Sequence, residues 1–270
     1  MSHPLRRVLI FLAAGALTML APVAEAGRQR AAAPGKAATA PAEPRFRTTQ
    51  VEFYLTEDSI AYVRPGLNVK VESITIPEDR RPVVEVTFTD DMNQPLDRLG
   101  QVTPGAISAS FILAVYDPAT RLYTPYTTRV QNAAPSAPNA PASDVQASAD
   151  SGGTWTDLAT GRARYRFRTA LPEGYDPSKT HTVGIYATRN LNEILGKSYY
   201  DNVEHDFRPD GGTVTARWDK IADASCNACH DQLALHGGSR RDVKLCVLCH
   251  NPETVDPDTG NSVDMATMVQ

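Results

Sequence analysis

The residues best suited to chemistry are the four cysteines of the chain and the histidines that follow them. They form two copies of one pattern, Cys226-Asn227-Ala228-Cys229-His230 and Cys246-Val247-Leu248-Cys249-His250. C-x-x-C-H is the attachment signature of c-type haem, because two thiols on one face of a helical turn can reach the two vinyl groups of one porphyrin. The adjoining histidine then ligates the iron as its proximal ligand. We therefore expect two covalent haem c groups, held by Cys226 and Cys229 and by Cys246 and Cys249, with His230 and His250 as proximal ligands.

The same cysteines allow two other interpretations. Sixteen residues separate Cys229 from Cys246, and the resulting C-x2-C-x16-C-x2-C spacing lies within the range of zinc ribbons. Four thiolates would complete a tetrahedral structural zinc site, whereas an oxidising compartment would allow disulfides. Neither interpretation explains why a histidine directly follows each pair in a chain that has six histidines in all. Haem attachment is the favoured interpretation.

His236 is the best candidate for a distal iron ligand. It follows His230 by six residues, which is about 9 Å along a helix, so it is poorly placed to reach the opposite face of the porphyrin attached beside it. We therefore expect His236 to ligate the iron of the neighbouring haem, which gives one six-coordinate, low-spin iron. The other iron would take His205, a methionine (Met265 or Met268), water or a ligand from a partner chain.

The N-terminus has the organisation of a secretory signal peptide over residues 1–26. Arg6 and Arg7 form its charged region, residues 8–20 its apolar region, and Ala24-Glu25-Ala26 its cleavage site. The apolar run of about 13 residues is shorter than the roughly 20 that cross a bilayer. No cysteine follows the signal, so we expect no lipoprotein anchor at the N-terminus. No later segment is apolar enough to cross a membrane, so we expect no transmembrane segment in the mature chain. The expected location is the periplasm, the outer-membrane surface or the extracellular space.

Between the N-terminus and the cysteines, the pattern is that of a β domain. Residues 27–45 are rich in Ala and Pro and are expected to form a disordered tether. Residues 46–218 contain short runs of β-branched and aromatic residues separated by turn signals. The expected strands are residues 51–55, 67–71, 83–88, 107–116, 121–129, 163–168, 182–188 and 212–217, with residues 131–153 as a long surface loop. Such runs without amphipathic helices predict an antiparallel Greek-key sandwich or split barrel.

The pattern changes after the β domain. Residues 219–270 combine short helical turns and loops with too few apolar residues for a core of their own. A segment of that size usually needs a staple such as a metal or a cofactor, and two covalently held porphyrins would supply the missing apolar mass. The predicted fold class is therefore mainly β: an antiparallel Greek-key domain followed by a small, loop-rich, partly helical c-type haem segment.

Charge and composition narrow the classes of function. The formal net charge is −4, and removal of the signal peptide with Arg6, Arg7 and Glu25 would change it to −5. An acidic chain is not expected to bind nucleic acid. No Ser/His/Asp arrangement, phosphate-binding loop or pair of catalytic acids stands out. We therefore expect an electron-transfer protein rather than an enzyme that converts a substrate.

Several stretches around the haem motifs resemble a known family. They are residues 226–238 (CNACHDQLALHGG), residues 245–252 (LCVLCHNP) and residues 205–211 (HDFRPDG). Over about residues 46–270, the chain is similar to the OmcA/MtrC-type multihaem cytochromes of bacterial outer surfaces. The resemblance implies c-type haems with two histidine ligands each, a Greek-key β domain beside them, and electron export to extracellular acceptors such as metal oxides. It also implies redox partner proteins, such as other multihaem cytochromes or an outer-membrane porin.

The chain departs from this family in the number of its haem motifs. It carries two, whereas the family carries more, and the sequence stops where the family continues into further ligands; we expect a truncated member. An electron carrier is the first class of function, resting on the haem motifs. The alternatives are a secreted β binding or scaffold module with a remnant tail, and a zinc-binding CxxC/CxxC segment. A visible spectrum of protein matured in the periplasm would distinguish them.

Overall fold

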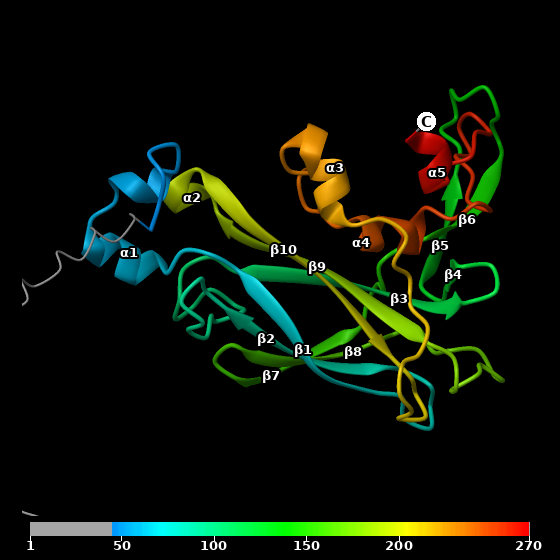
Figure 1. Cartoon of the computed structure of the whole chain (residues 1–270), viewed down its shortest axis with the longest axis horizontal. Coiled ribbons are helices and arrows are strands. Elements are labelled where there is room, and N and C mark those ends of the chain that lie inside the picture. Colours follow the sequence, from blue (N-terminus) through cyan, green and yellow to red (C-terminus); the bar gives the residue numbers. More distant parts are fainter. Residues whose placement is uncertain (1–44, 270) are drawn as a thin grey trace, which may run out of the picture. The chain divides into compact units, whose positions relative to one another are not determined.

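Two antiparallel β-sheets packed face to face form the main body of the chain (Figure 1). The structure is a computed structural model that describes residues 45–269. One sheet has the strand order β1-β2-β8-β7 and the other β10-β9-β3-β4, while β5 and β6 form a separate two-stranded sheet. The predicted mainly β, antiparallel fold is thus confirmed. The expected signal peptide (1–26) and all but the last residue of the expected tether (27–45) lie outside the described residues.

The elements are, in chain order, η1 (Val51–Tyr54), α1 (Glu57–Val63), β1 (Asn68–Thr75), β2 (Val83–Thr89), β3 (Ile107–Asp117), β4 (Leu122–Pro125), β5 (Thr128–Asn132), β6 (Ser143–Ala147), β7 (Thr154–Ala159), β8 (Arg162–Arg166), β9 (His181–Leu191), α2 (Asn192–Leu195), β10 (Lys197–Phe207), α3 (Asp223–His230), α4 (Val243–Cys249) and α5 (Met265–Met268). The long strands β3, β9 and β10 belong to the sheet on which α4, the helix with the second cysteine pair, lies.

The main core lies between the two four-stranded sheets. Alternation along β2 buries Val84, Val86 and Phe88 completely, because successive side chains of a strand point to opposite faces. Phe111 of β3 stacks on Tyr165 of β8 with ring centres 4.3 Å apart, so aromatic contacts join the two sheets. This core contains no residue of the cysteine-bearing segment.

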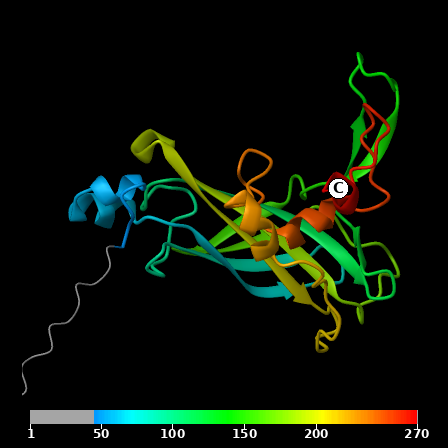
Figure 2. The same ribbon diagram turned by 45° about the horizontal axis from the view of Figure 1, so that its top comes forward.

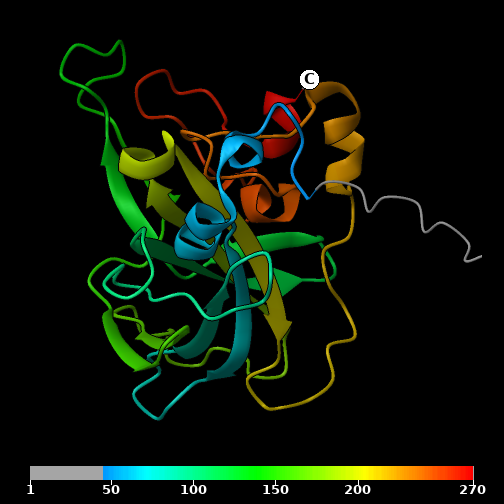
Figure 3. The ribbon, with the colours of Figure 1, turned by 90° about the vertical axis from the view of Figure 1, so that its left-hand side faces the viewer.

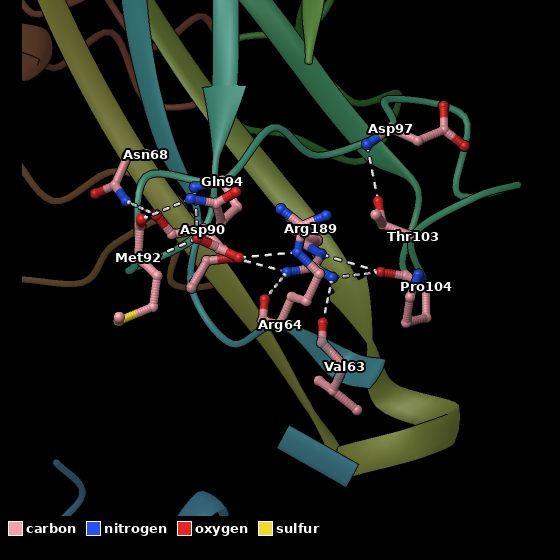
Figure 4. A network of polar contacts seen from close by, with 11 residues as sticks. Val63, Arg64, Asn68, Asp90, Met92, Gln94, Asp97, Thr103, Pro104 and Arg189 are labelled. Carbon is pink, nitrogen blue, oxygen red and sulfur yellow. Dashed lines mark hydrogen bonds and ion pairs between the residues drawn. The ribbon is translucent and has the colours of Figure 1, made fainter. Parts of the chain in front are cut away.

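Arg189 fixes one end of the sandwich (Figure 4). Its side chain is completely buried on β9, and its guanidinium donates to the backbone carbonyls of Val63, Arg64, Gly66 and Pro104 over 2.5 to 3.1 Å. A buried guanidinium needs such acceptors, because an unpaired charge in the interior is costly. Arg189 therefore ties the end of α1 and the loop before β3 to the sheet.

Three sequence predictions within the β domain need correction. Residues 51–55, expected as a strand, form η1, in which Glu52 is buried while Val51, Phe53 and Tyr54 are exposed; the alternation there does not place apolar side chains in a core. Residues 212–217, also expected as a strand, belong to no strand. The expected surface loop at residues 131–153 instead contains β6 and the end of β5, which pair as a hairpin from Thr128↔Ala147 to Asn132↔Ser143.

The short helices and this hairpin lie outside the sandwich, on the β10-β9-β3-β4 side. α4 lies against that sheet, whereas α3 stands beyond α4, farther from the strands (Figure 1 and Figure 3). Figure 2 shows the β5–β6 hairpin projecting from the body, with the loop before α5 running beside it. The segment with both cysteine pairs is therefore held between a sheet face and a projecting hairpin.

Candidate haem-binding site

The first cysteine pair lies on α3. Cys226 is half-buried and Cys229 is exposed, and His230 is the last residue of the helix and is also exposed. No residue of α3 is buried. Asp223, in its first turn, accepts a hydrogen bond from the backbone N–H of Val243 over 2.6 Å, so the start of α3 is joined to the start of α4. The first motif is thus presented on an open helix beside the second.

The second cysteine pair lies on α4, which packs tightly on the sheet. Leu245, Cys246 and Leu248 are buried, and Lys244 forms a 2.7 Å ion pair with Asp206 of β10. Close approach is possible because β9 has Gly184 here: a Cβ at that position would lie 2.3 Å from Leu248 Cδ1. The lack of a side chain at Gly184 therefore lets α4 lie directly on the strand.

His250 is oriented by a backbone carbonyl. Its Nδ1 lies 2.8 Å from the carbonyl oxygen of Val263, and its backbone N–H donates to Cys246 at the end of α4. A carbonyl only accepts hydrogen bonds, so Nδ1 must carry the proton and Nε2 keeps a free lone pair. This is the arrangement in which metal-ligating histidines are commonly held by a second hydrogen bond.

His236 faces His250 across a pocket. The two ring centres are 6.0 Å apart and the ring planes are inclined by 26°. This separation would leave room for an iron ion between the two imidazoles. Burial, then the positive charge of Arg240, lowers the pKa of His236, which favours the neutral, ligating form.

The pocket between these histidines also contains the second cysteine pair. It has about 980 Å³ of empty space, part of it open to solvent. Its walls include Cys246, Cys249, His236 and His250. They also include apolar side chains from the sheet, the hairpin, α4 and α5, namely Ile112, Tyr186, Ala147, Leu245, Met265 and Met268. Both thiols of one motif, its histidine and an opposed histidine thus lie around a single cavity. The residues fit a covalently attached porphyrin with two axial imidazoles.

A second, more apolar pocket lies on the other side of α4. It has about 750 Å³ of empty space and is lined by Cys226, Val243, Val247, Trp218 and Tyr123 among others. His250 and Met265 line both pockets, so they lie between the two cavities.

Burial raises the pKa of both Cys246 and Cys249 to about 11, so these thiols are protonated near neutral pH.

His205 does not lie near either pocket. It is on β10, where Tyr199, Val203 and Phe207 pack into the core between the sheets, and His205 shares their face by strand alternation. The opposite face of β10 carries Asp206, which contacts α4. The structure therefore brings His236 to the second motif but leaves His205 on the far face of its strand.

The four cysteines are not assembled into one cluster. They are all free thiols, and within residues 45–269 no group of three or more Cys, His, Asp or Glu side chains is placed to hold a metal ion. A four-thiolate zinc site would need both pairs around one point. The two pairs instead lie on separate helices: Cys246 and Cys249 line one pocket, and Cys226 of the first pair lines the other.

The comparisons with known proteins concern the haem segment and the fold of the chain. Residues 219–270 match the family model "Outer membrane cytochrome MtrC/MtrF-like, domains II/IV". The structure is similar to the outer membrane decaheme cytochrome OmcA, with a TM-score of 0.58, 20% identity, and coverage of 76% of this chain and 32% of that one. The haem segment thus matches the MtrC/MtrF-like family model, and the fold of the chain resembles that of OmcA. The resemblance inferred from its motifs is confirmed.

A second member of this cytochrome family has a similar fold. MtrC from Shewanella baltica OS185 aligns with a TM-score of 0.51 and 23% identity over 75% of this chain and 32% of its own. The chain thus spans about a third of the length of either cytochrome. A comparison with curated protein sequences gave no match. None of the helices in residues 45–269 has the length and apolarity that a bilayer crossing requires.

Sequence reasoning identified the cysteines and histidines of the site but missed the groups that surround them. The carbonyl of Val263 lies 13 residues beyond His250, and backbone acceptors leave no signal in side-chain patterns. Arg129 and Gln146, which line the pocket from the hairpin, fell within or beside a stretch interpreted as a loop. Only a prediction of that hairpin would have revealed them.

Proposed function

We propose that residues 219–270 hold two covalent haem c groups and that the protein transfers electrons through them. The observation that carries the proposal is the pocket in which Cys246, Cys249 and His250 of one motif face His236 at a ring separation of 6.0 Å. When bound, haem iron supplies a one-electron ferric/ferrous couple. The match of residues 219–270 to an outer membrane cytochrome family model and the similarity of the fold to OmcA support the same class of function.

The residues have distinct roles in this proposal. Cys246 and Cys249 would hold one porphyrin through thioether bonds, and His250 and His236 would ligate its iron. The Val263 carbonyl holds the proton on Nδ1 of His250 and so leaves Nε2 for the iron. Two imidazole ligands would give a six-coordinate, low-spin iron.

Cys226, Cys229 and His230 hold the other porphyrin beside α3. In the described part of the chain, no histidine faces His230 in the way that His236 faces His250. We propose that its iron takes water, a partner ligand or Met265, which lines both pockets. His205 is not used, because it lies on the opposite face of β10 from α4.

The test is to express the full chain, signal peptide included, in a host that attaches c-type haem. A pyridine haemochrome assay is expected to give two haems per chain. The pair Cys246→Ala/Cys249→Ala should lose one haem, and Cys226→Ala/Cys229→Ala should lose the other. Met92→Ala, an exposed residue outside the segment, is the control and should keep both. Protein without a Soret band, or with one bound zinc per chain, would contradict the proposal.

The location and partners follow from the same proposal. We propose export through the signal peptide at residues 1–26 and action at the outer surface, with electrons passing to extracellular acceptors such as metal oxides and exchanged with other multihaem cytochromes or an outer-membrane porin. Support comes from the names of the two similar structures, one of which is an outer membrane cytochrome. Fractionation of expressing cells tests the location, and loss of the haem-stained band from the outer-membrane fraction would argue against it.

A secreted β scaffold remains the second candidate function. It is favoured by the sandwich, whose core is complete without residues 219–270. The haem assay separates the two, because a scaffold would be purified without haem and would keep its fold.

A further inference from the structure

Two arginines line the pocket of the second motif without a carboxylate partner. Arg240 is half-buried and Arg129 is exposed, and both contribute to the pocket that contains His236 and His250. Among the described residues, neither forms an ion pair. The comparably half-buried Arg98, in contrast, pairs with Asp157.

Arg240 is held in place by its surroundings. Its guanidinium carbon lies 3.7 Å above the ring centre of Tyr186 on β9, a cation–π contact that fixes the plane of the group. Its backbone pairs with Leu235 in a short β-bridge, with N···O distances of 2.9 and 3.2 Å. The turn that carries His236 into the pocket therefore brings Arg240 with it. Its side chain donates to Ser239 Oγ over 2.7 Å, which leaves most of its five N–H groups free.

Arg129 approaches the pocket from a different element. It lies on β5, opposite Gln146 of β6, and no side chain of the described residues accepts a hydrogen bond from it. Two unpaired guanidinium groups, one from the hairpin and one from the haem segment, thus border one cavity. Both guanidinium groups are placed to pair with an anionic group in that cavity.

We propose that Arg129 and Arg240 bind the propionates of the haem attached at Cys246 and Cys249, and that their charge raises its midpoint potential. This inference rests on the proposed function. A porphyrin of haem c carries two propionates, and guanidinium–carboxylate pairs are strong because both N–H donors of the fork can be used. A positive charge near the iron favours the ferrous state, which carries one positive charge fewer than the ferric state.

The test is a spectroelectrochemical titration of haem-loaded protein with the variants Arg129→Gln, Arg240→Gln and the double variant. Each single variant should lower the potential of the low-spin haem, and the double variant should shift its ferric/ferrous ratio at fixed poise about tenfold, which is about 59 mV for one electron. Arg240→Lys should keep most of the potential. Arg162→Gln, on the outer face of β8 and paired with Glu85, is the matched control and should leave it unchanged.

A second readout separates charge from a change of fold. The propionate bending modes in resonance Raman spectra should shift in Arg240→Gln and Arg129→Gln but not in Arg162→Gln. Unchanged potential and unchanged propionate modes in the double variant would overturn the inference, as would an Arg240→Lys potential as low as that of Arg240→Gln. If wild-type protein binds no covalent haem, the proposed function fails instead.

Discussion

Two side chains determine the geometry of the site at the residue scale. His236 has a positive φ of 50° and is followed by two glycines, Gly237 and Gly238, that also have positive φ. Three successive residues with positive φ form a tight turn of the backbone. That turn directs the imidazole toward His250 and not toward the motif directly before it in the sequence. The sequence spacing indicated that His236 is poorly placed to ligate the haem attached at Cys226 and Cys229. The opposed rings of His236 and His250 favour the haem attached at Cys246 and Cys249 instead.

The first prediction concerns this ligand. His236→Ala should convert one haem from low-spin to high-spin, because its iron loses the sixth ligand, while the other haem keeps its spin state. Electron paramagnetic resonance and the visible bands of ferric protein measure the change, and added imidazole should restore the low-spin signal. His205→Ala is the matched control and should change neither haem. Two haems that stay low-spin in His236→Ala would show that the ligand assignment is wrong.

A buried acid beneath the haem segment should make stability depend on pH. Burial, and next the negative charge of Asp242, raises the pKa of Glu204 on β10 to about 8, and its Oε1 is buried without a hydrogen-bond partner. The folded state therefore holds this proton more tightly than the unfolded state does. Between the ordinary glutamate pKa and about 8, the unfolded state binds fewer protons, so the free energy of unfolding falls as pH rises.

The second prediction follows from that sign. Urea denaturation of the wild type should give a lower midpoint at pH 8 than at pH 5.5. Glu204→Gln, which cannot ionise, should reduce this difference and raise the midpoint at pH 8. Glu193→Gln, on the exposed helix α2, serves as the control and should retain the wild-type dependence. A midpoint that rises with pH in the wild type and in Glu204→Gln alike would contradict the assignment.

At the scale of elements, the β5–β6 hairpin supports the loop that orients His250. Asp144 accepts from the backbone N–H of Val255 over 2.9 Å, and Gln146 donates to the carbonyl of the same residue over 2.9 Å. Further along, Asp258 accepts from the backbone of Ala134 in the hairpin loop over 2.6 Å. The loop thus supported ends at Val263, whose carbonyl holds the His250 ring.

The third prediction tests this support. Asp144→Ala/Gln146→Ala should speed amide hydrogen exchange over residues 252–263 and lower the stability of the loop by about 1 to 3 kcal/mol, because each lost hydrogen bond contributes about 1 kcal/mol. Exchange in β9 should stay unchanged. Gln131→Ala removes a hairpin side chain that bonds only its neighbour Asn132, and it should leave the loop protected. Equal protection in the double variant and the wild type would show that the hairpin does not hold the loop.

The elements that could be predicted from sequence are those with strong local patterns. β2 and β3 follow their expected bounds closely because their apolar residues face a core. β10 was missed, since its 11 residues are largely polar and its identity depends on pairing with β9 along its whole length. The cysteine motifs were found because their ligands are adjacent in sequence. Their pocket depends on contacts between distant residues, such as Tyr186 and Arg240, which no local pattern encodes.

At the scale of the whole molecule, one apolar cluster joins the sandwich to the haem segment. The sheet contributes Ile112, Ala114, Tyr116 and Tyr123, and the haem segment contributes Val243, Leu245 and Leu248, with Trp218 between them in sequence. The cluster lies on the opposite face of β3 from the main core. The boundary proposed at residue 218 therefore separates two sequence patterns, but the β domain and the haem segment on either side of it share one apolar cluster.

The fourth prediction concerns the isolated domain. Residues 46–218 should fold independently into a strand-dominated domain, because the core between the sheets lies wholly within them. Far-ultraviolet circular dichroism measures this, and substantial helix would refute it. The uncovered cluster should make the fragment associate or bind a hydrophobic dye, since exposed apolar patches promote association. Replacing Ile112 and Tyr116 with Ser should reduce that association, whereas Val130→Ser, on an already exposed strand, should not.

The docking of α4 also bears on how such a protein would mature. Cys246 retains only 7% of its surface when α4 lies on the sheet, whereas Cys229 on α3 is exposed. A thioether bond can form only when an assembly factor and the porphyrin reach the thiol. On the proposed function, attachment at the second motif therefore has to precede the docking of α4, while the first motif stays accessible in the folded chain. The order of folding and attachment therefore matters for the haem at Cys246 and Cys249 but not for the haem at Cys226 and Cys229.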